Sequence, residues 1–281
     1  MKIIETIDKM QTEAEKIRLS GRRIGLVPTM GFLHEGHLSL IRNARESSDT
    51  VITSIFVNPT QFGPGEDYED YPRDPERDIR MAEAAGSDII FHPSAKEMYP
   101  EGYQTFVTVE KLTKVLCGLS RPQHFRGVTT VVIKLFNATK PHLAIFGQKD
   151  AQQALVIRRM VNDLNLDIEI KISPIIREPD GLAMSSRNTY LDATQRKNAT
   201  VLYRSLILAR QLIESGERSA RRISDELVKI IAQTDGAEID YVSMVDTAKL
   251  EPVQTLSGEI LIAEAVRFGK TRLIDNIILT V

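Results

Sequence analysis

The chain has 281 residues, of which 42% are hydrophobic, so it is long enough for one large domain or two unequal ones. Its 36 Lys and Arg residues against 38 Asp and Glu residues give a formal net charge of −2, which argues against a nucleic acid partner. No segment has 18 consecutive apolar residues and the N-terminal segment lacks a signal-peptide pattern, so we expect a soluble protein with no membrane partner. The single cysteine, Cys117, excludes an intrachain disulfide and favours a cytoplasmic location.

The first 175 residues alternate strand-like and helix-like segments. Buried apolar runs predict strands at 23–29, 50–57, 87–91, 142–146 and 167–173, and amphipathic runs predict helices at 37–47, 74–85, 127–139 and 150–164. Strands separated by helices require right-handed crossovers between parallel neighbours. Residues 1–175 are therefore predicted to form an α/β domain with a doubly wound, mostly parallel sheet.

The pattern changes near residue 176. Two consecutive helices are predicted at 192–215 and 220–234, and three strands follow at 238–245, 259–266 and 271–279. Helices followed by strands are typical of an α+β arrangement. We therefore expect a smaller C-terminal α+β domain at 176–281.

The segment VPTMGFLHEGHL (27–38) joins the first of these strands to a helix and contains two histidines, His34 and His37. A zinc protease needs H-E-x-x-H, with the histidines four residues apart, but here they are three apart and no third ligand is evident. A structural pair of hydrogen-bonded histidines at the start of the helix is a second interpretation. A third is phosphate binding, because the helix N-terminus offers free N–H groups, and Gly31 and Gly36 allow close approach. The pattern His-x-Gly-His is typical of the superfamily of nucleotidyl-transferring enzymes.

Two further turns have the chemistry of a phosphate site. In FGQKD (146–150) a strand ends at a glycine and Lys149 follows, as a mobile charge able to reach phosphate. In MSSRN (184–188) two hydroxyl groups precede Arg187, which suits a triphosphate. Each turn alone could be an exposed lysine or a polar cap. Their coincidence with the histidine segment favours a nucleotide site.

Five motifs together resemble the pantothenate synthetase family, also called pantoate–β-alanine ligases. They are PTMGFLHEGH (28–37), FVNPTQF (56–62), RPQHFRGVTTVV (121–132), FGQKDAQQ (146–153) and GLAMSSRN (181–188), and they occur in the family's order. Gln123 departs from the family pattern RPGHF, in which glycine occupies this position. The C-terminal part matches by general pattern rather than by motif.

The resemblance implies a Rossmann-like N-terminal domain, a C-terminal lid, a homodimer and an AMP-forming ligase reaction. Pantoate would attack the α-phosphorus of MgATP to give pantoyl adenylate and pyrophosphate, and β-alanine would then displace AMP to give pantothenate. Mg²⁺ would enter with ATP as substrate, and no side chain is predicted to ligate it.

The resemblance also assigns roles residue by residue. His34 and His37 would contact the phosphates, with His37 as the nominal proton donor, and Lys149 and Arg187 would complete the catalytic set. Gln61 and Gln153 would hold pantoate. The ATP site would comprise Met30, Gly31, Phe32, Leu33, His34, Glu35, Gly36, His37, Gly147, Gln148, Lys149, Asp150, Ile176, Met184, Ser185, Ser186 and Arg187.

Two other functions are compatible with a nucleotide site. One is a nucleotidyltransferase of the same superfamily that adenylylates a phosphorylated acceptor and whose product retains AMP. The other is a regulatory module that binds a nucleotide without turnover. Paired glutamines suit a carboxylic acid better than a phosphorylated acceptor, because a neutral amide orients a carboxylate without blunting its nucleophilicity.

Overall fold

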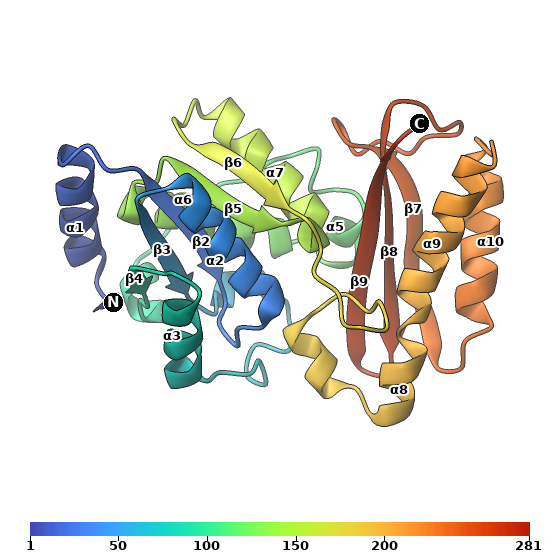
Figure 1. Ribbon diagram of the computed structural model, residues 1–281, viewed down its shortest axis with the longest axis horizontal. Coiled ribbons are helices and arrows are strands. Elements are labelled where there is room, and N and C mark those ends of the chain that lie inside the picture. Colours follow the sequence, from blue (N-terminus) through green and yellow to red (C-terminus); the bar gives the residue numbers. More distant parts are fainter. The chain divides into compact units, whose positions relative to one another are not determined.

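The structure, a computed structural model that describes residues 1–281, divides into two compact units (Figure 1). The first unit comprises Met1–Glu110, Arg121–Gln148 and Val156–Pro174. The second comprises Lys111–Ser120, Lys149–Leu155 and Ile175–Val281. None of the helices combines the length and the hydropathy that a membrane span requires.

The first unit is built on a six-stranded sheet in the order β1-β4-β3-β2-β5-β6, and all of its strand pairs are parallel. Helices of this unit connect the strands, and α2 packs on β2, β3 and β5. The predicted α/β fold with a parallel sheet is confirmed. The strands are β1 (Lys2–Ile4), β2 (Ile24–Thr29), β3 (Thr50–Ile55), β4 (Ile89–Phe91), β5 (Leu143–Gly147) and β6 (Glu169–Ser173), and the helices are α1 (Ile7–Leu19), α2 (Glu35–Ser47), α3 (Pro75–Ala84), α4 (Ala95–Met98), α6 (His124–Thr139) and α7 (Ala151–Asp163), of which Ala151–Leu155 belong to the second unit.

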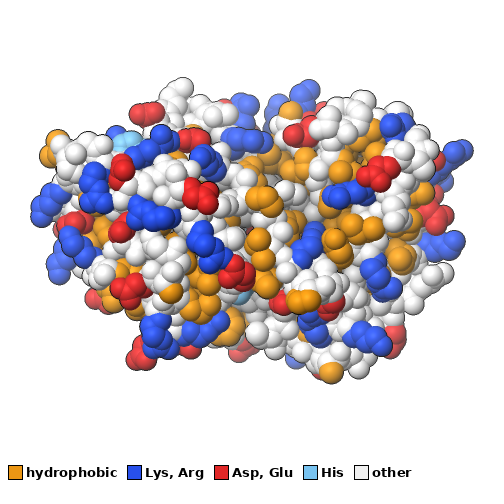
Figure 2. Space-filling view, viewed as in Figure 1, with side chains coloured by type: hydrophobic (Ala, Val, Ile, Leu, Met, Phe, Trp, Pro, Cys, Tyr) orange, Lys and Arg blue, Asp and Glu red, His pale blue; other side chains and the backbone are white.

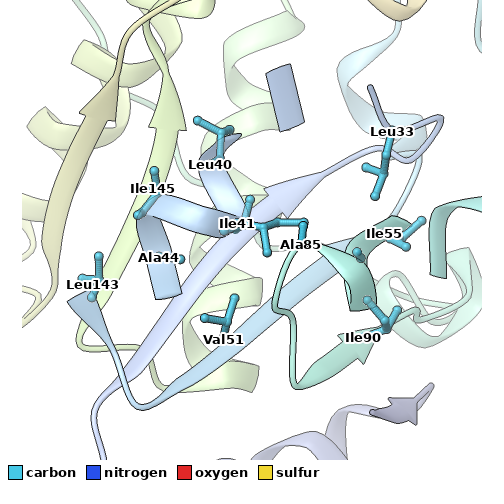
Figure 3. Close-up of a cluster of buried hydrophobic side chains, with 12 residues drawn as sticks. Leu33, Leu40, Ile41, Ala44, Val51, Ile55, Ala85, Ile90, Leu143 and Ile145 are labelled. Carbon is cyan, nitrogen blue, oxygen red and sulfur yellow. The ribbon is translucent and has the colours of Figure 1, made fainter. Parts of the chain in front are cut away.

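One face of this sheet forms a core with α2 and α3. Figure 3 shows Ile41 and Ala44 of α2 against Val51 and Ile145 of the strands, and all four side chains are fully buried. Ile41 and Ala44 are three residues apart on the helix, and Leu143, two residues from Ile145 on β5, belongs to the same cluster. This core fixes the position of α2, which begins after the turn that follows β2.

The order of the strands creates a switch point between β2 and β5. From β2 the chain continues to β3 on one side, whereas β5 pairs with β2 on its other side. Ligands of open α/β sheets bind at the carboxyl ends of the strands at such a point. The segments that follow β2 and β5, Met30–His37 and Gly147–Gln148, are therefore the segments to inspect.

The second unit is built on an antiparallel sheet in the order β7-β8-β9. Helices α9 and α10 pack on one face, where apolar residues at helical spacing, such as Ile223 and Leu227, meet Ile260 and Ile262 of β8. The predicted α+β arrangement is confirmed. The elements are β7 (Ala237–Asp246), β8 (Glu259–Phe268), β9 (Thr271–Thr280), α5 (Cys117–Ser120), α8 (Ala193–Asn198), α9 (Val201–Glu214) and α10 (Ala220–Ala232).

Two features differ from the predicted elements. The helix predicted at 192–215 is two helices, because α8 ends at Asn198 and α9 begins only at Val201. Asn, Thr and Val in this region have low helix propensity, and the chain forms a turn at residues 199–200 between the two helices. In addition, β1 and α1 lie at residues 2–19, where the sequence pattern predicts no element.

Candidate active site

The turn after β2 has an unusual backbone. Gly31 has φ +86° and Phe32 has φ +49°, so two successive residues lie in the left-handed region. Glycine suits the first of these positions for a second reason, because a Cβ at residue 31 would lie 2.9 Å from Oδ2 of Asp78. The turn thus requires both a permissive residue and a partner that holds its backbone.

That partner is Asp78, which α3 presents from 45 residues further along the chain. The N–H groups of Phe32 and Leu33 donate to its two carboxyl oxygens at 2.6 and 2.7 Å. The Asp78 side chain is only 1% exposed. Burial raises the pKa of Asp78, while the two backbone N–H groups and Arg77 act in the opposite direction. A buried carboxyl group therefore fixes the residues immediately before the histidine pair.

The two histidines cap the start of α2 reciprocally. His34 is the N-cap residue, and its Nδ1 accepts from the N–H of Gly36 at 3.1 Å. The N–H of His34 in turn donates to Nδ1 of His37 at 3.3 Å, and the ring centres lie 4.0 Å apart. Histidine here replaces the serine and glutamate of an ordinary capping box. The predicted structural pair of histidines is thus present.

The cap also defines the chemistry of the opposite edges of the rings. A neutral imidazole that accepts a hydrogen bond at Nδ1 carries its proton on Nε2. Both rings are therefore set as Nε2–H donors at the N-terminus of a helix, where a phosphate is favoured. The structural and the phosphate-binding interpretations are compatible, because they use different nitrogen atoms.

Gln61 lies in a 3₁₀ turn, Pro59–Gln61, and its side chain is buried. Its Oε1 accepts from Nδ2 of Asn58 at 3.0 Å, and its Nε2 donates to Sδ of Met30 at 3.1 Å. Tyr99 fixes Asn58 in turn, because its hydroxyl donates to Oδ1 of Asn58 at 2.7 Å. Burial raises the pKa of Tyr99 to about 12, so the phenol keeps its proton and remains a donor.

The motif RPQHFRG packs against the same turn. Arg121 Nη2 and His124 Nδ1 lie 3.3 and 3.0 Å from the carbonyl oxygen of Gln61. A Cβ at Gly127 would lie 2.3 Å from the carbonyl oxygen of Thr60, so only glycine lets α6 approach so closely. Gln123 precedes α6 with φ −96°, a conformation open to any residue, so its departure from the family's glycine causes no backbone strain.

Beside β2, strand β5 ends at Gly147, where a Cβ would meet no atom within 4 Å, and Gln148 follows at the switch point. The first unit thus brings together the Met30–His37 turn, Gln61 and the end of β5. The order of the motifs in the sequence does not by itself predict this proximity. The other predicted site residues belong to the second unit. They are Lys149, Asp150, Gln153, Ile176, Met184, Ser185, Ser186 and Arg187.

In the second unit, the two neighbouring glutamines at the start of α7 differ in role. Gln152 is buried and structural, since its Nε2 donates to the carbonyls of Leu112 and Val115 and its Oε1 accepts from the N–H of Cys117. Gln153, the predicted pantoate residue, is half-buried. Lys149 is largely covered, and its Nζ lies 3.8 Å from Oδ2 of Asp150.

The MSSRN segment is a 3₁₀ turn at Ser186–Tyr190. Ser185 is its N-cap residue and accepts from the N–H of Arg187 at 3.3 Å. The N–H of Met184 donates to the carbonyl of Ile176 at 3.0 Å, which brings two predicted ATP-site residues together. The cap function that we considered for this segment is present at Ser185.

Sequence reasoning missed Asp78, Asn58 and Tyr99. Asp78 had a signal, because it shares the apolar stripe of α3 with Ala82 and Ala85 at helical spacing, and a carboxyl group on such a stripe requires a partner. Asn58 stands inside the quoted NPTQF motif but was given no role. Tyr99 offered no signal in the sequence.

A parallel α/β unit with a capped histidine pair at its switch point has the arrangement expected of a nucleotide-binding α/β enzyme. The sequence profile of pantoate-β-alanine ligase matches residues 2–278. The chain therefore belongs to the pantoate–β-alanine ligase family, and it is a ligase.

Relatives that match over nearly their full length support the assignment to this family. The chain is similar to the pantothenate synthetases of Acetivibrio thermocellus and Heliobacterium modesticaldum, with 56% and 59% identity over 281 residues, 100% of each chain. Its structure resembles the crystal structure of pantothenate synthetase from Thermus thermophilus, with 43% identity, a TM-score of 0.93 and 99% of each chain covered. It also resembles pantoate-β-alanine ligase from Francisella tularensis complexed with β-γ ATP and β-alanine, with 36% identity, a TM-score of 0.80 and coverage of 99% and 97%.

Proposed function

We propose that this chain condenses pantoate with β-alanine to form pantothenate, with ATP converted to AMP and pyrophosphate through a pantoyl-adenylate intermediate. The observation that carries the proposal is the histidine turn after β2, found in a chain that matches the ligase family over residues 2–278. Two Nε2–H donors at a helix N-terminus suit a triphosphate, and the family match supplies the acid and the amine.

The first half-reaction joins two anions. A carboxylate oxygen of pantoate attacks the α-phosphorus, and pyrophosphate leaves with the electron pair of the broken P–O bond. Because negative charge approaches negative charge, catalysis consists mainly of positioning and neutralisation. We assign this task to the donors of His34 and His37 and to the cations of Lys149 and Arg187.

Gln61 and Gln153 are proposed to hold pantoate. The amide of Gln61 is oriented by Asn58, and its present acceptor, the Met30 thioether, is a weak one. A hydroxyl or carboxylate oxygen of pantoate could replace this sulfur at little cost. Because the amide is neutral, it would orient the carboxylate without forming an ion pair that reduces its nucleophilicity.

In the second half-reaction the neutral amine of β-alanine attacks the acyl carbon of the mixed anhydride. The C–O bond to AMP breaks, AMP leaves, and the nitrogen loses a proton. The adenylate also reacts with water, so the site must exclude bulk solvent while the intermediate waits.

Mg²⁺ is proposed to arrive as part of MgATP. No three His, Cys, Asp or Glu side chains are grouped to hold a metal ion, and Asp150, the acidic neighbour of Lys149, is half exposed. A Mg²⁺ ion that enters with ATP would keep several waters and be held mostly by the substrate phosphates. When bound, it would neutralise charge on the phosphates as pyrophosphate leaves.

We further propose a homodimer in the cytoplasm. The homodimer rests on the family resemblance, whereas the cytoplasmic location rests on the single, buried free thiol of Cys117, which fits a reducing compartment. On the face drawn in Figure 2, basic and acidic side chains are intermixed, in keeping with the net charge of −2. Light scattering of the purified chain tests the dimer, which predicts twice the chain mass of 31.6 kDa.

Product analysis tests the proposed reaction against the nucleotidyltransferase. The chain is incubated with MgATP and with pantoate and β-alanine, singly and together, and the nucleotides are separated. Release of free AMP with pantothenate only when both acids are present supports the ligase. AMP retained on an acceptor would support the transferase, and no turnover would leave a binding module.

A further inference from the structure

Two adjacent residues of β9, Asp275 and Asn276, are buried polar side chains between the apolar Leu273 and Ile277. Their exposed fractions are 2% and 3%. Burying a carboxylate and an amide costs free energy unless their hydrogen bonds are satisfied. Their partners belong to the two segments of the second unit that contain proposed ATP-binding residues.

Asp275 holds Arg177 in a bidentate pair. Nη1 and Nη2 of Arg177 donate to Oδ2 and Oδ1 of Asp275 at 2.6 and 3.0 Å. Nη1 also donates to the carbonyl of Gly181 at 3.0 Å, and the guanidinium lies 4.4 Å from the centre of the Tyr203 ring. A planar guanidinium held by a carboxylate, a carbonyl and an aromatic ring has little freedom to move.

Arg177 stands at the base of a short hairpin that leads into the MSSRN segment. Its backbone pairs with Ala183, and the N–H of Met184 bonds to the carbonyl of Ile176. At the tip, Gly181 has φ +94°, and a Cβ there would lie 1.9 Å from the Tyr203 ring. The 3₁₀ turn that follows, Ser186–Tyr190, contacts β9. Fixing Arg177 therefore fixes the start of the segment that carries Ser185 and Arg187.

Asn276 holds the other segment. Successive side chains of a strand point to opposite faces of the sheet, so Asn276 faces away from Asp275. Its Nδ2 donates to the carbonyl oxygen of Lys149 at 3.0 Å. This bond anchors the backbone from which the Lys149 side chain extends. One strand thus holds the hairpin on one face and the lysine turn on the other.

The carboxyl group opposite Asp275 has a hydrogen-bond partner of its own, Ser205. Glu264, fully buried on β8, pairs with Asp275 across the sheet. Burial, with a further contribution from Asp275, raises the pKa of Glu264 well above the usual value, which favours the protonated form. Ser205 Oγ lies 2.8 Å from Glu264 and 2.7 Å from the carbonyl of Leu202. A protonated Glu264 can donate to this hydroxyl, which then donates to the carbonyl.

We propose that Asp275 and Asn276 are positioning residues for adenylate formation, holding the Arg187 segment and the Lys149 turn at a fixed separation. The inference rests on the proposed function, since it assigns both segments to ATP. Neither residue touches substrate in this account. Asp275 acts through Arg177 and the hairpin, and Asn276 acts through the backbone of Lys149.

A double-mutant cycle tests the role of Asn276. Asn276→Ala should slow single-turnover formation of pantoyl adenylate roughly 10- to 100-fold, the effect of a small misplacement of a catalytic group. In the Lys149→Ala background, Asn276→Ala should slow adenylate formation less than about twofold, because the lysine side chain that Asn276 positions is already absent. A merely structural role predicts the same factor in both backgrounds, and that result would overturn the proposal for Asn276.

Asp275→Asn should lower the rate at saturating ATP and leave the KM for pantoate unchanged. Glu264→Gln is the matched control, because it replaces a neutral buried carboxyl on the neighbouring strand with a neutral amide and should leave the rate unchanged. Rates are expressed per folded molecule, from circular dichroism. If wild type makes pantothenate but Asn276→Ala and Asp275→Asn are as fast, only the positioning role fails. If wild type makes none, the proposed function fails first.

Discussion

Replacing Asp78 with Asn separates the placement of the histidine turn from the stability of the fold. In the native chain both carboxyl oxygens accept backbone N–H groups, from Phe32 and Leu33 at 2.6 and 2.7 Å. Asparagine has nearly the same shape but only one acceptor oxygen, so one N–H would face the amide NH₂ group. The turn would have to shift to avoid this contact between two donors.

The two consequences have different sizes. A hydrogen bond to a charged acceptor contributes about 1.5–3 kcal/mol. Burial, however, raises the pKa of Asp78, which means that the folded protein disfavours the carboxylate, and a neutral residue avoids that cost. We therefore expect the free energy of unfolding to change by only about 1–2 kcal/mol. A shift of about 1 Å at His34 and His37 should slow adenylate formation by roughly 100-fold.

Urea denaturation gives the free energy of unfolding, and rapid-quench measurement of pyrophosphate gives the rate of adenylate formation. Asp74→Asn is the matched control on the same helix. Asp74 caps α3 by accepting from the N–H of Arg77, and Asn is an equally good N-cap residue, so both quantities should stay at wild-type values. Adenylate formation by Asp78→Asn at the wild-type rate would refute the role assigned to Asp78.

Four further substitutions test other parts of the account. His37→Ala should slow adenylate formation about 10²–10³-fold, measured by quench flow, and a near wild-type rate would remove it from catalysis. Gln61→Ala should weaken pantoate binding more than ATP binding in calorimetric titrations, and the reverse order would contradict its role. Gly127→Ala should lower the melting temperature and raise the KM for pantoate, because its Cβ would lie 2.3 Å from the Thr60 carbonyl oxygen; an unchanged KM would argue against coupling to Gln61. Burial raises the pKa of Glu264 in the folded protein above its value in the unfolded chain. Between these two pKa values the free energy of unfolding therefore falls by about 1.4 kcal/mol for each unit that the pH rises. Glu264→Gln should therefore gain stability over wild type with rising pH in urea denaturation, whereas a constant difference would contradict a neutral Glu264.

The fold was predictable where the pattern is local. Strands such as Thr50–Ile55 are β-branched and continuously buried, so composition alone identifies them. Helix α1 was missed although Met10, Ala14 and Ile17 lie at helical spacing, because its remaining residues are mostly polar and charged. The membership of residues 111–120 and 149–155 in the second unit depends on contacts with residues far along the chain, which no local pattern reveals.

The candidate site shows the same division. The pair His34 and His37 was identifiable from spacing and position, and its capping geometry follows from being at a helix start. Asp78 acts on a turn 45 residues away, and only the fold brings the two together. Of two adjacent glutamines, the buried Gln152 forms hydrogen bonds to backbone groups of Leu112 and Cys117. The sequence alone does not show that Gln152 has this structural role and that Gln153 does not.

The central claim is that a carboxylate oxygen of pantoate attacks the α-phosphorus of ATP. It is tested most directly with pantoate labelled with ¹⁸O in both carboxylate oxygens, incubated with MgATP and β-alanine, followed by mass spectrometry of the nucleotide and of pyrophosphate. The account predicts AMP that carries one ¹⁸O atom and unlabelled pyrophosphate. Unlabelled AMP, with the heavy oxygen in pyrophosphate or phosphate, would contradict it.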